Sequence, residues 1–126
     1  MARDVEQTAL FVDIAGSTRL TEESGDVGAR DLLGTCLDVM EKAVTKRGGR
    51  VCRRVGDELL CLFEDPDAAA GTAADLHSAL TLAHRHGTIT RPVRLRIGFE
   101  HGVVVEHEKE LYGLTVNVAA RLSTLA

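Results

Sequence analysis

The sequence is poor in aromatic residues and has no long apolar run. Only 3% of its 126 residues are aromatic and none is tryptophan, so its arginines are not accompanied by rings on which nucleic-acid bases would stack. The formal charge of −4 gives no general attraction for nucleic acid or for an anionic membrane. No apolar run approaches the roughly 20 residues that a membrane-spanning helix needs. These absences argue against a nucleic-acid partner and against a membrane segment in this chain.

Cysteine is also scarce. Three cysteines, an odd number without the spacing of a disulfide framework, fit a reducing compartment. The N-terminal stretch MARDVEQT lacks the apolar region of a secretory signal. A chain of 126 residues is long enough for one domain with a core and too short for two. We therefore expect one cytoplasmic domain over residues 1–126.

The pattern of apolar residues predicts eight elements in the order β-α-β-β-α-β-β-α. The first strand is expected at 8–14, and helical spacing from Ala29 to Val44 indicates a helix that stops at Gly48 and Gly49. Residues 51–55 and 59–63 form the arms of a hairpin, and the second helix begins with Asp65 as its N-cap. Further strands are expected at 93–99 and 103–105, before a last helix. This order predicts an α+β fold in which helices pack on a mainly antiparallel sheet.

Two acidic residues stand where strands end. Asp13 ends the first strand, and Asp57 follows Gly56 at the tip of the hairpin. If these strands are neighbours, the two carboxylates converge at one edge of the sheet, where they would suit a hard divalent ion such as Mg²⁺. Each residue also has a purely structural interpretation, Asp13 as a strand end before a helix and Asp57 as a turn former.

Asn117 and Arg121 lie four residues apart in the last predicted helix, and therefore on one face of it. An amide and a guanidinium that project together suit a sugar hydroxyl and a phosphate. They would equally suit a solvated helix surface.

Four stretches resemble, in order and spacing, the catalytic domain of class III nucleotidyl cyclases. They are LFVDIAGSTRL, GGRVCRRVGDELLCLF, RIGFEHGVVV and YGLTVNVAARL, and together they cover nearly the whole chain from Thr8 onward. The resemblance implies a ferredoxin-like, palm-type antiparallel sheet. It also implies an enzyme that converts a nucleoside triphosphate to its 3′,5′-cyclic monophosphate and pyrophosphate.

The resemblance also implies roles for individual residues. Asp13 and Asp57, assisted by the carbonyl of Ile14, match the ligands of two Mg²⁺ or Mn²⁺ ions. Asn117 matches the asparagine that orients the ribose, and Arg121 the arginine that neutralises charge on phosphorus in the transition state. Gly16 and residues 17–24 would lie near the triphosphate. The two acids would come from one chain and Asn117 and Arg121 from another, so the expected unit is a homodimer with shared sites.

At two positions this chain keeps the charge found in the adenylate cyclases of this family, but its side chains have a different shape. Arg53 stands where they carry a lysine, and Glu110 stands where they carry an acidic residue; in those enzymes the pair reads adenine. Arginine is longer than lysine and forked, so the replacement is not neutral at a base-reading site. ATP is the expected substrate. The alternative is an altered base preference, for GTP or for a pyrimidine nucleotide.

Two further interpretations concern the activity itself. Family members continue past the last helix with more strands, so we expect residues 1–126 to be a catalytic domain shortened at its C-terminus. This leaves open a catalytically inactive module for dimerisation or nucleotide sensing. The diguanylate cyclases, with a related fold, rank low because VGDEL matches their GG-D/E-E-F hairpin only in part.

Three smaller expectations concern side chains outside these motifs. Cys52 and Cys61 would be cross-strand neighbours if Gly56 and Asp57 form a two-residue turn, and we expect both to stay free thiols. The arginines at 91, 94 and 96 are expected on the solvated side of their strand. His101 stands where the family has a small polar residue, and the sequence gives no reason for it.

Overall fold

The computed structural model describes the backbone of residues 3–107, 110–112 and 114–125, and the side chains of residues 4–16, 25, 27–105 and 116–122. Over these residues the predicted order of elements is confirmed. The strands are β1 (Arg3–Ala15), β2 (Arg50–Val55), β3 (Glu58–Phe63), β4 (Arg94–His107) and β5 (Glu110–Tyr112). The helices are α1 (Ser17–Lys46), α2 (Pro66–Arg85) and α3 (Leu114–Leu125). In this part of the chain, no helix combines the length and the apolar character that a bilayer crossing requires.

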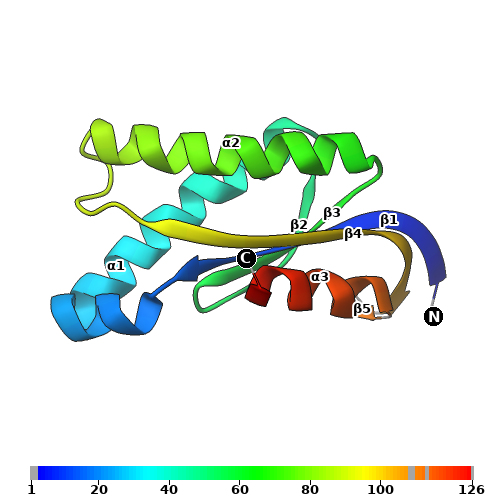
Figure 1. Cartoon of the computed structure of the whole chain (residues 1–126), viewed down its shortest axis with the longest axis horizontal. Helices are drawn as coiled ribbons and strands as arrows, with labels where there is room; N and C mark the ends of the chain where they lie inside the picture. The colour runs from blue at the N-terminus through cyan, green and yellow to red at the C-terminus, as the bar shows by residue number, and fades with distance from the viewer. Residues whose placement is uncertain (1–2, 108–109, 113, 126) are drawn as a thin grey trace.

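The strands form one antiparallel sheet in the order β2-β3-β1-β4-β5. Helices cover both sides of it, with α2 and α3 on opposite sides (Figure 1). On the α1–α2 face, Leu10, Val12 and Ile14 of β1 belong to the larger core cluster. On the α3 face, Ala9 and Phe11 pack in a smaller cluster with Val116 and Ala119 of α3. This alternation along β1 is what a strand buried on both faces requires.

The prediction of a separate strand at 103–105 is wrong. β4 is continuous through Gly102, which pairs with Gln7, because β1 extends back to Arg3 and offers a partner along the whole length of β4. A glycine weakens a strand but keeps its backbone hydrogen bonds. The seventh element of the pattern is instead β5, whose three residues are too few to show an apolar period.

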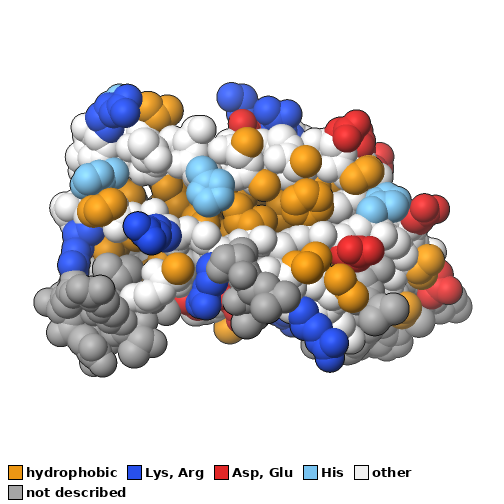
Figure 2. Space-filling view, viewed as in Figure 1, with side chains coloured by type: hydrophobic (Ala, Val, Ile, Leu, Met, Phe, Trp, Pro, Cys, Tyr) orange, Lys and Arg blue, Asp and Glu red, His pale blue; other side chains and the backbone are white. Residues whose placement is uncertain are grey.

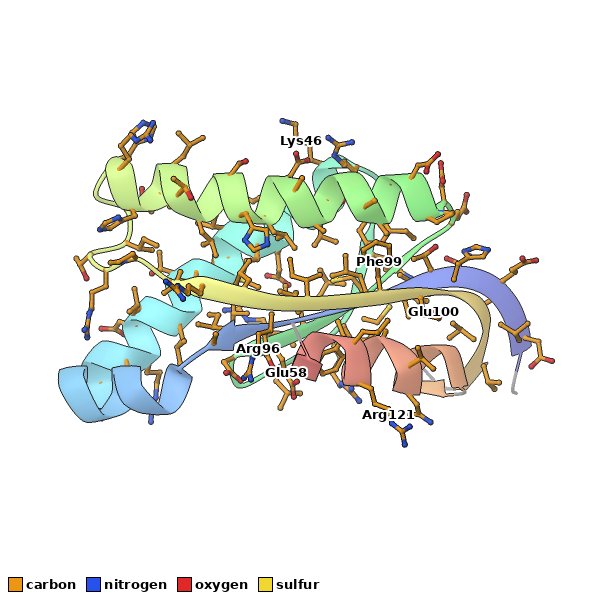
Figure 3. The ribbon with its side chains drawn as sticks, viewed as in Figure 1. Lys46, Glu58, Arg96, Phe99, Glu100 and Arg121 are labelled. Atoms are coloured by element: carbon orange, nitrogen blue, oxygen red, sulfur yellow. The ribbon has the colours of Figure 1, made fainter. Side chains whose placement is uncertain are left out.

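The predicted inward side of β4 is confirmed. Its apolar side chains pack against the larger core cluster and remain partly exposed; they are Val93, Leu95, Ile97 and Phe99. Figure 2 shows apolar side chains gathered between α2 and β4, and Figure 3 labels Phe99 among them. The β4 edge of the core is therefore less completely covered by helices than its centre.

The C-terminal end of α1 and the N-terminal end of α2 lie where the sequence predicts. The backbone N–H of Gly48 donates to Thr45 O at 3.1 Å beyond the end of α1, and Gly48 has a left-handed φ of 81°. Asp65 caps α2, since its Oδ1 accepts from the N–H of Asp67 at 2.8 Å and Pro66 fills the first position. At its other end α1 extends back to Ser17 across a kink at Gly25, whose φ of 75° is non-helical.

A β-bulge in β2 overturns the expected neighbours of Cys61. Val51 pairs with Cys61 and Arg53 pairs with Leu60, so Cys52 is the extra residue between them. Cys52 packs on the α3 face, whereas Cys61 is buried in the α1–α2 face. Neither Cys52 nor Cys61 is in a disulfide, as expected, and they lie on different faces of the sheet.

Candidate functional site

The two predicted metal carboxylates belong to adjacent strands. Asp13 pairs with Glu58 where β1 lies against β3, and the N–H of Ile14 donates to the backbone oxygen of Asp57 at 3.1 Å. Gly56 has a φ of 59°, which suits glycine and lets the hairpin turn tightly at this point. The condition set by the sequence, that these strands are neighbours, is met. Asp13 and Asp57 therefore lie at the same end of the sheet.

Arg96 is a further member of this site that the sequence analysis assigned to the solvated side of its strand. Its Nε lies 3.0 Å from Oδ1 of Asp13, and the Asp13 side chain is only 18% exposed. The Arg96 side chain is 39% exposed and alternates with the core-packed Leu95 and Ile97, as expected, but its ion pair with Asp13 was not predicted. The pair forms because Asp13 and Arg96 are directly opposite each other in the β1–β4 register. No local pattern in the sequence reports a register between residues 83 apart.

Glu58 adds a third carboxylate to the same row of side chains. Glu58, Asp13 and Arg96 occupy one row across β3, β1 and β4 on the α3 face, and Figure 3 labels the first and last of them. Burial raises the pKa of Glu58, and the negative charges of Asp57 and Asp13 raise it further. The strand end thus gathers acidic side chains whose charges oppose one another.

This donor set fits a hard divalent cation. Within the described residues no three side chains of His, Cys, Asp or Glu form a ready metal cluster. Mg²⁺, however, is commonly bound by one or two carboxylates and completed by waters and substrate phosphates. Besides burial, the negative charges of Asp57 and Asp13 raise the pKa of Glu58, and a cation at this position would offset those charges. Asp13, Asp57 and the carbonyl of Ile14 are thus suitable ligands.

The start of α1 follows directly on β1. Gly16, the N-cap residue, has a left-handed φ of 74° and no side chain with which to cap the helix that begins at Ser17. The first N–H groups of a helix without a side-chain cap favour an anion. The side chains of 17–24, predicted to lie near the triphosphate, are outside the described residues.

Arg53 projects from the same face as the carboxylates. The bulge sets Arg53 opposite Leu60, which belongs to the α3 face, and the Arg53 side chain is exposed. Glu110, its predicted partner in base recognition, lies in β5 at the opposite edge of the sheet. The Glu110 side chain is outside the described residues, so the pairing stays a prediction.

Asn117 and Arg121 lie on the outer side of α3. Val116 and Ala119 are buried against the sheet, while Asn117 and Arg121 are exposed, and Figure 3 shows Arg121 pointing away from the sheet. Across the described side chains, no hydrogen bond or ion pair links either residue to Asp13 or Asp57. The shared helix face is confirmed, and the structure does not bring it to the carboxylates of the same chain.

The comparison with protein families gives one match over nearly the whole chain. A family model described as "Adenylate and Guanylate cyclase catalytic domain" matches residues 2–126. An adenylate cyclase of Streptomyces coelicolor is 36% identical over 118 residues, which cover 92% of this chain and 29% of that protein. Adenylate cyclase 2 of Rhizobium meliloti is 31% identical, over 95% of this chain and 37% of its own length. The chain thus spans about a third of the length of these curated relatives.

Solved structures agree with the fold. A bacterial light-regulated adenylyl cyclase superposes with a TM-score of 0.88 and 28% identity, over 99% of this chain and 41% of that one. The adenylyl cyclase CyaB from P. aeruginosa superposes with a TM-score of 0.84 and 27% identity, over 99% of this chain and 74% of that one.

Proposed function

The chain belongs to the adenylate and guanylate cyclase catalytic domain family, and from this premise we propose that it converts a nucleoside triphosphate to the 3′,5′-cyclic monophosphate and pyrophosphate. ATP is the proposed substrate, because the curated relatives at 36% and 31% identity are named adenylate cyclases. The observation that carries the proposal is the acidic end of β1 and the β2–β3 hairpin. There Asp13, Asp57 and Glu58 gather beside Arg96.

In this proposal Asp13, Asp57 and the Ile14 carbonyl hold two Mg²⁺ or Mn²⁺ ions. When bound, the ions would supply charge neutralisation for the triphosphate and acidify the attacking ribose 3′-hydroxyl. Arg96 places a guanidinium beside the same carboxylates, where it would favour a phosphate oxygen. The N–H groups at the start of α1 would do the same.

The transition state needs a second set of groups, which Asn117 and Arg121 would supply. The amide of Asn117 would orient the ribose so that its 3′-oxygen is in line with the α-phosphorus and the leaving pyrophosphate. The guanidinium of Arg121 would neutralise the charge that develops on the α-phosphoryl oxygens. Both side chains are exposed on α3, and among the described residues neither forms a hydrogen bond or ion pair with Asp13 or Asp57 of the same chain. A site made of both sets therefore requires a second copy, which supports a homodimer with two shared sites.

The base preference follows from Arg53 and Glu110 in this proposal. Arg53 is exposed on the α3 face, where it is available to a base. A forked guanidinium presents donors in a different geometry from an ammonium, so GTP and the pyrimidine nucleotides are the alternatives to ATP.

The experiment is product analysis of the purified chain. It is incubated with ATP, GTP, CTP or UTP, in Mg²⁺ and in Mn²⁺, and cyclic nucleotides are identified by mass spectrometry. A cyclic product supports the proposal and identifies the base. No product from folded wild-type chain would favour the second candidate, an inactive module that binds nucleotide, and calorimetric titration with ATP would then test that binding directly.

The Asp57→Asn variant tests the metal assignment within this experiment. Removing one carboxylate should abolish turnover and leave the fold and the oligomeric state unchanged. Asp31→Asn is a matched control, because Asp31 is exposed on α1. Equal turnover of Asp57→Asn and wild type would contradict the assignment.

A further inference from the structure

The C-terminal half of β2 places two consecutive arginines on opposite faces of the sheet. Without the bulge, strict alternation from Val51 would place Arg53 on the α1–α2 face. The extra residue Cys52 reverses this alternation, so that Arg53 pairs with Leu60 and Arg54 with Leu59. Leu60 lies in the α3-face cluster and Leu59 in the α1–α2-face cluster. The bulge thus turns Arg53 toward the proposed nucleotide side and Arg54 toward α1.

Arg54 is anchored to α1 by three hydrogen bonds. Its Nη1 donates to Oδ1 of Asp38 at 2.8 Å and to Oε2 of Glu41 at 2.9 Å. Its Nη2 donates to the backbone oxygen of Gly34 at 3.3 Å. Acceptors from three positions along two turns of a helix define both the place and the orientation of the planar guanidinium.

Apart from the Arg54 bonds, this half of β2 is held from one side only. β2 is an edge strand, bonded to β3 alone, and residues 53–55 are all exposed. The turn at Gly56 and the pairing with β3 set its register, but no buried side chain of residues 53–55 fixes them against the helices. The stretch of α1 that receives Arg54, by contrast, is fixed in the core through Cys36, Leu37 and Met40, each at most 3% exposed. The Arg54 bonds therefore tie an otherwise weakly fixed segment to a rigid one.

We propose that Arg54 is a positioning residue for base recognition: by tying the bulged part of β2 to α1, it holds Arg53 in the orientation that reads the nucleotide base. This inference rests on the proposed cyclase function and adds to it a residue that does not touch the substrate. Arg54 acts through the backbone of its neighbour, and Asp38 and Glu41 act through Arg54.

The test compares base discrimination in four forms of the whole chain: wild type, Arg54→Ala, Arg54→Lys and Arg47→Ala. Arg47 is a matched control because its Nε bonds Asp75 of α2 at 2.6 Å, so its loss also removes an exposed arginine–carboxylate pair from α1. For each form, kcat and KM are measured with the preferred nucleotide and with the next best. Hydrogen exchange of peptides covering 50–56 reports the order of β2 without any substrate.

Arg54→Ala should raise KM for the preferred nucleotide more than it lowers kcat, since base contacts bind ground and transition states alike. Discrimination between the two nucleotides should fall by about three- to tenfold, the effect of losing one well-placed hydrogen bond. Exchange over 50–56 should quicken. Arg54→Lys should recover part of the discrimination, because an ammonium reaches one carboxylate but not all three acceptors. Arg47→Ala should leave discrimination unchanged.

The outcomes separate this inference from the function on which it rests. Absence of any cyclic product from wild type overturns the proposed function and this inference with it. Product from wild type with equal discrimination in Arg54→Ala overturns the inference alone, as does an equal loss in Arg47→Ala. If Arg54→Ala fails to fold, Asp38→Ala removes one of the three acceptors, and equal discrimination in that variant and wild type overturns the inference.

Discussion

Glu58 is a carboxyl group whose charged form is disfavoured by its surroundings. Burial and the neighbouring charges of Asp57 and Asp13 raise its pKa above the ordinary value of 4.5. A carboxyl group with a raised pKa binds its proton more tightly in the folded state. Glu58 therefore contributes most to the free energy of unfolding below about pH 4.5, where it is protonated in both states. This contribution is lost as the pH rises through the pKa of Glu58 in the folded state.

Glutamine does not ionise, so replacing Glu58 by glutamine should prevent the loss of stability at neutral pH. In metal-free buffer we expect Glu58→Gln to raise Tm by about 1–3 °C at pH 7 and to leave it unchanged at pH 4. Thermal unfolding followed by circular dichroism at both pH values measures this. Glu100→Gln is the control, since Glu100 is exposed on β4 and should give no such difference. A lower Tm for Glu58→Gln at pH 7 would show that the carboxylate is stabilising instead.

The three thiols should differ in reactivity. Burial raises the pKa of Cys36 to about 11 and that of Cys61 to about 12, whereas Cys52 is only partly buried. Because the thiolate is the nucleophile, native protein at pH 8 should be alkylated by iodoacetamide at Cys52 first, by at least about tenfold in rate. Peptide mass spectrometry gives the three rates, and denatured protein provides the reference in which all three react. Equal rates at Cys52 and Cys61 in the native state would contradict the burial of Cys61.

The role of a single residue can be predicted from the sequence when the pattern that indicates it lies in the neighbouring residues. Asp57 follows a turn glycine and Asp13 ends an apolar run, so both could be selected as candidates from local pattern. Arg96 and Glu58 could not, because their place beside Asp13 depends on the register of three strands. His101 is explained only by the fold: its Nδ1 lies 2.7 Å from Oγ1 of the fully buried Thr8, across the β1–β4 pair.

Among the secondary-structure elements, the end of α1 and the start of α2 were predicted well, whereas the start of α1 at Ser17 and the interruptions of strands were not. Asp65, Pro66 and Gly48 act through bonds within a few residues, which the sequence displays. The bulge at Cys52 and the continuity of β4 through Gly102 are properties of pairs of strands. They depend on the length and register of the neighbouring strand, which the sequence of one strand alone does not reveal.

Replacing each of two glycines by alanine should change the stability of the fold in opposite directions. A Cβ at Gly49 would lie 2.5 Å from the ring of the buried Phe63 and 2.8 Å from Val44 Cγ1, so Gly49→Ala should destabilise by about 1–3 kcal/mol. A Cβ at Gly34, inside α1, would meet nothing within 4 Å. Gly34→Ala should therefore stabilise by about 0.5–1 kcal/mol, through helix propensity. Urea unfolding measures both. A stabilised Gly49→Ala would contradict the close packing at Gly49, and a destabilised Gly34→Ala would contradict the open space at Gly34.

The two faces of the sheet have different roles in the whole molecule. The α1–α2 face holds the larger core, and α1 receives the Arg54 anchor. The α3 face carries the row of Glu58, Asp13 and Arg96, together with Arg53 and the helix that bears Asn117 and Arg121. Since the last two residues point outward from α3, the proposed chemistry becomes complete only when a second α3 faces the row.

A shared site makes a quantitative prediction for mixed dimers. Asp57→Asn and Arg121→Ala should each be inactive alone, because each homodimer lacks one necessary group in both sites. In a heterodimer of the two, one site loses both groups, and the other takes Asp57 from one chain and Arg121 from its partner. A 1:1 mixture that exchanges subunits freely should therefore recover about a quarter of wild-type turnover, since half the dimers are mixed and each has one intact site. Tandem purification with two different tags isolates the heterodimer, whose turnover should be about half that of wild type. A purified, folded heterodimer with no turnover would place all four proposed residues in a single chain's site and would exclude the shared arrangement.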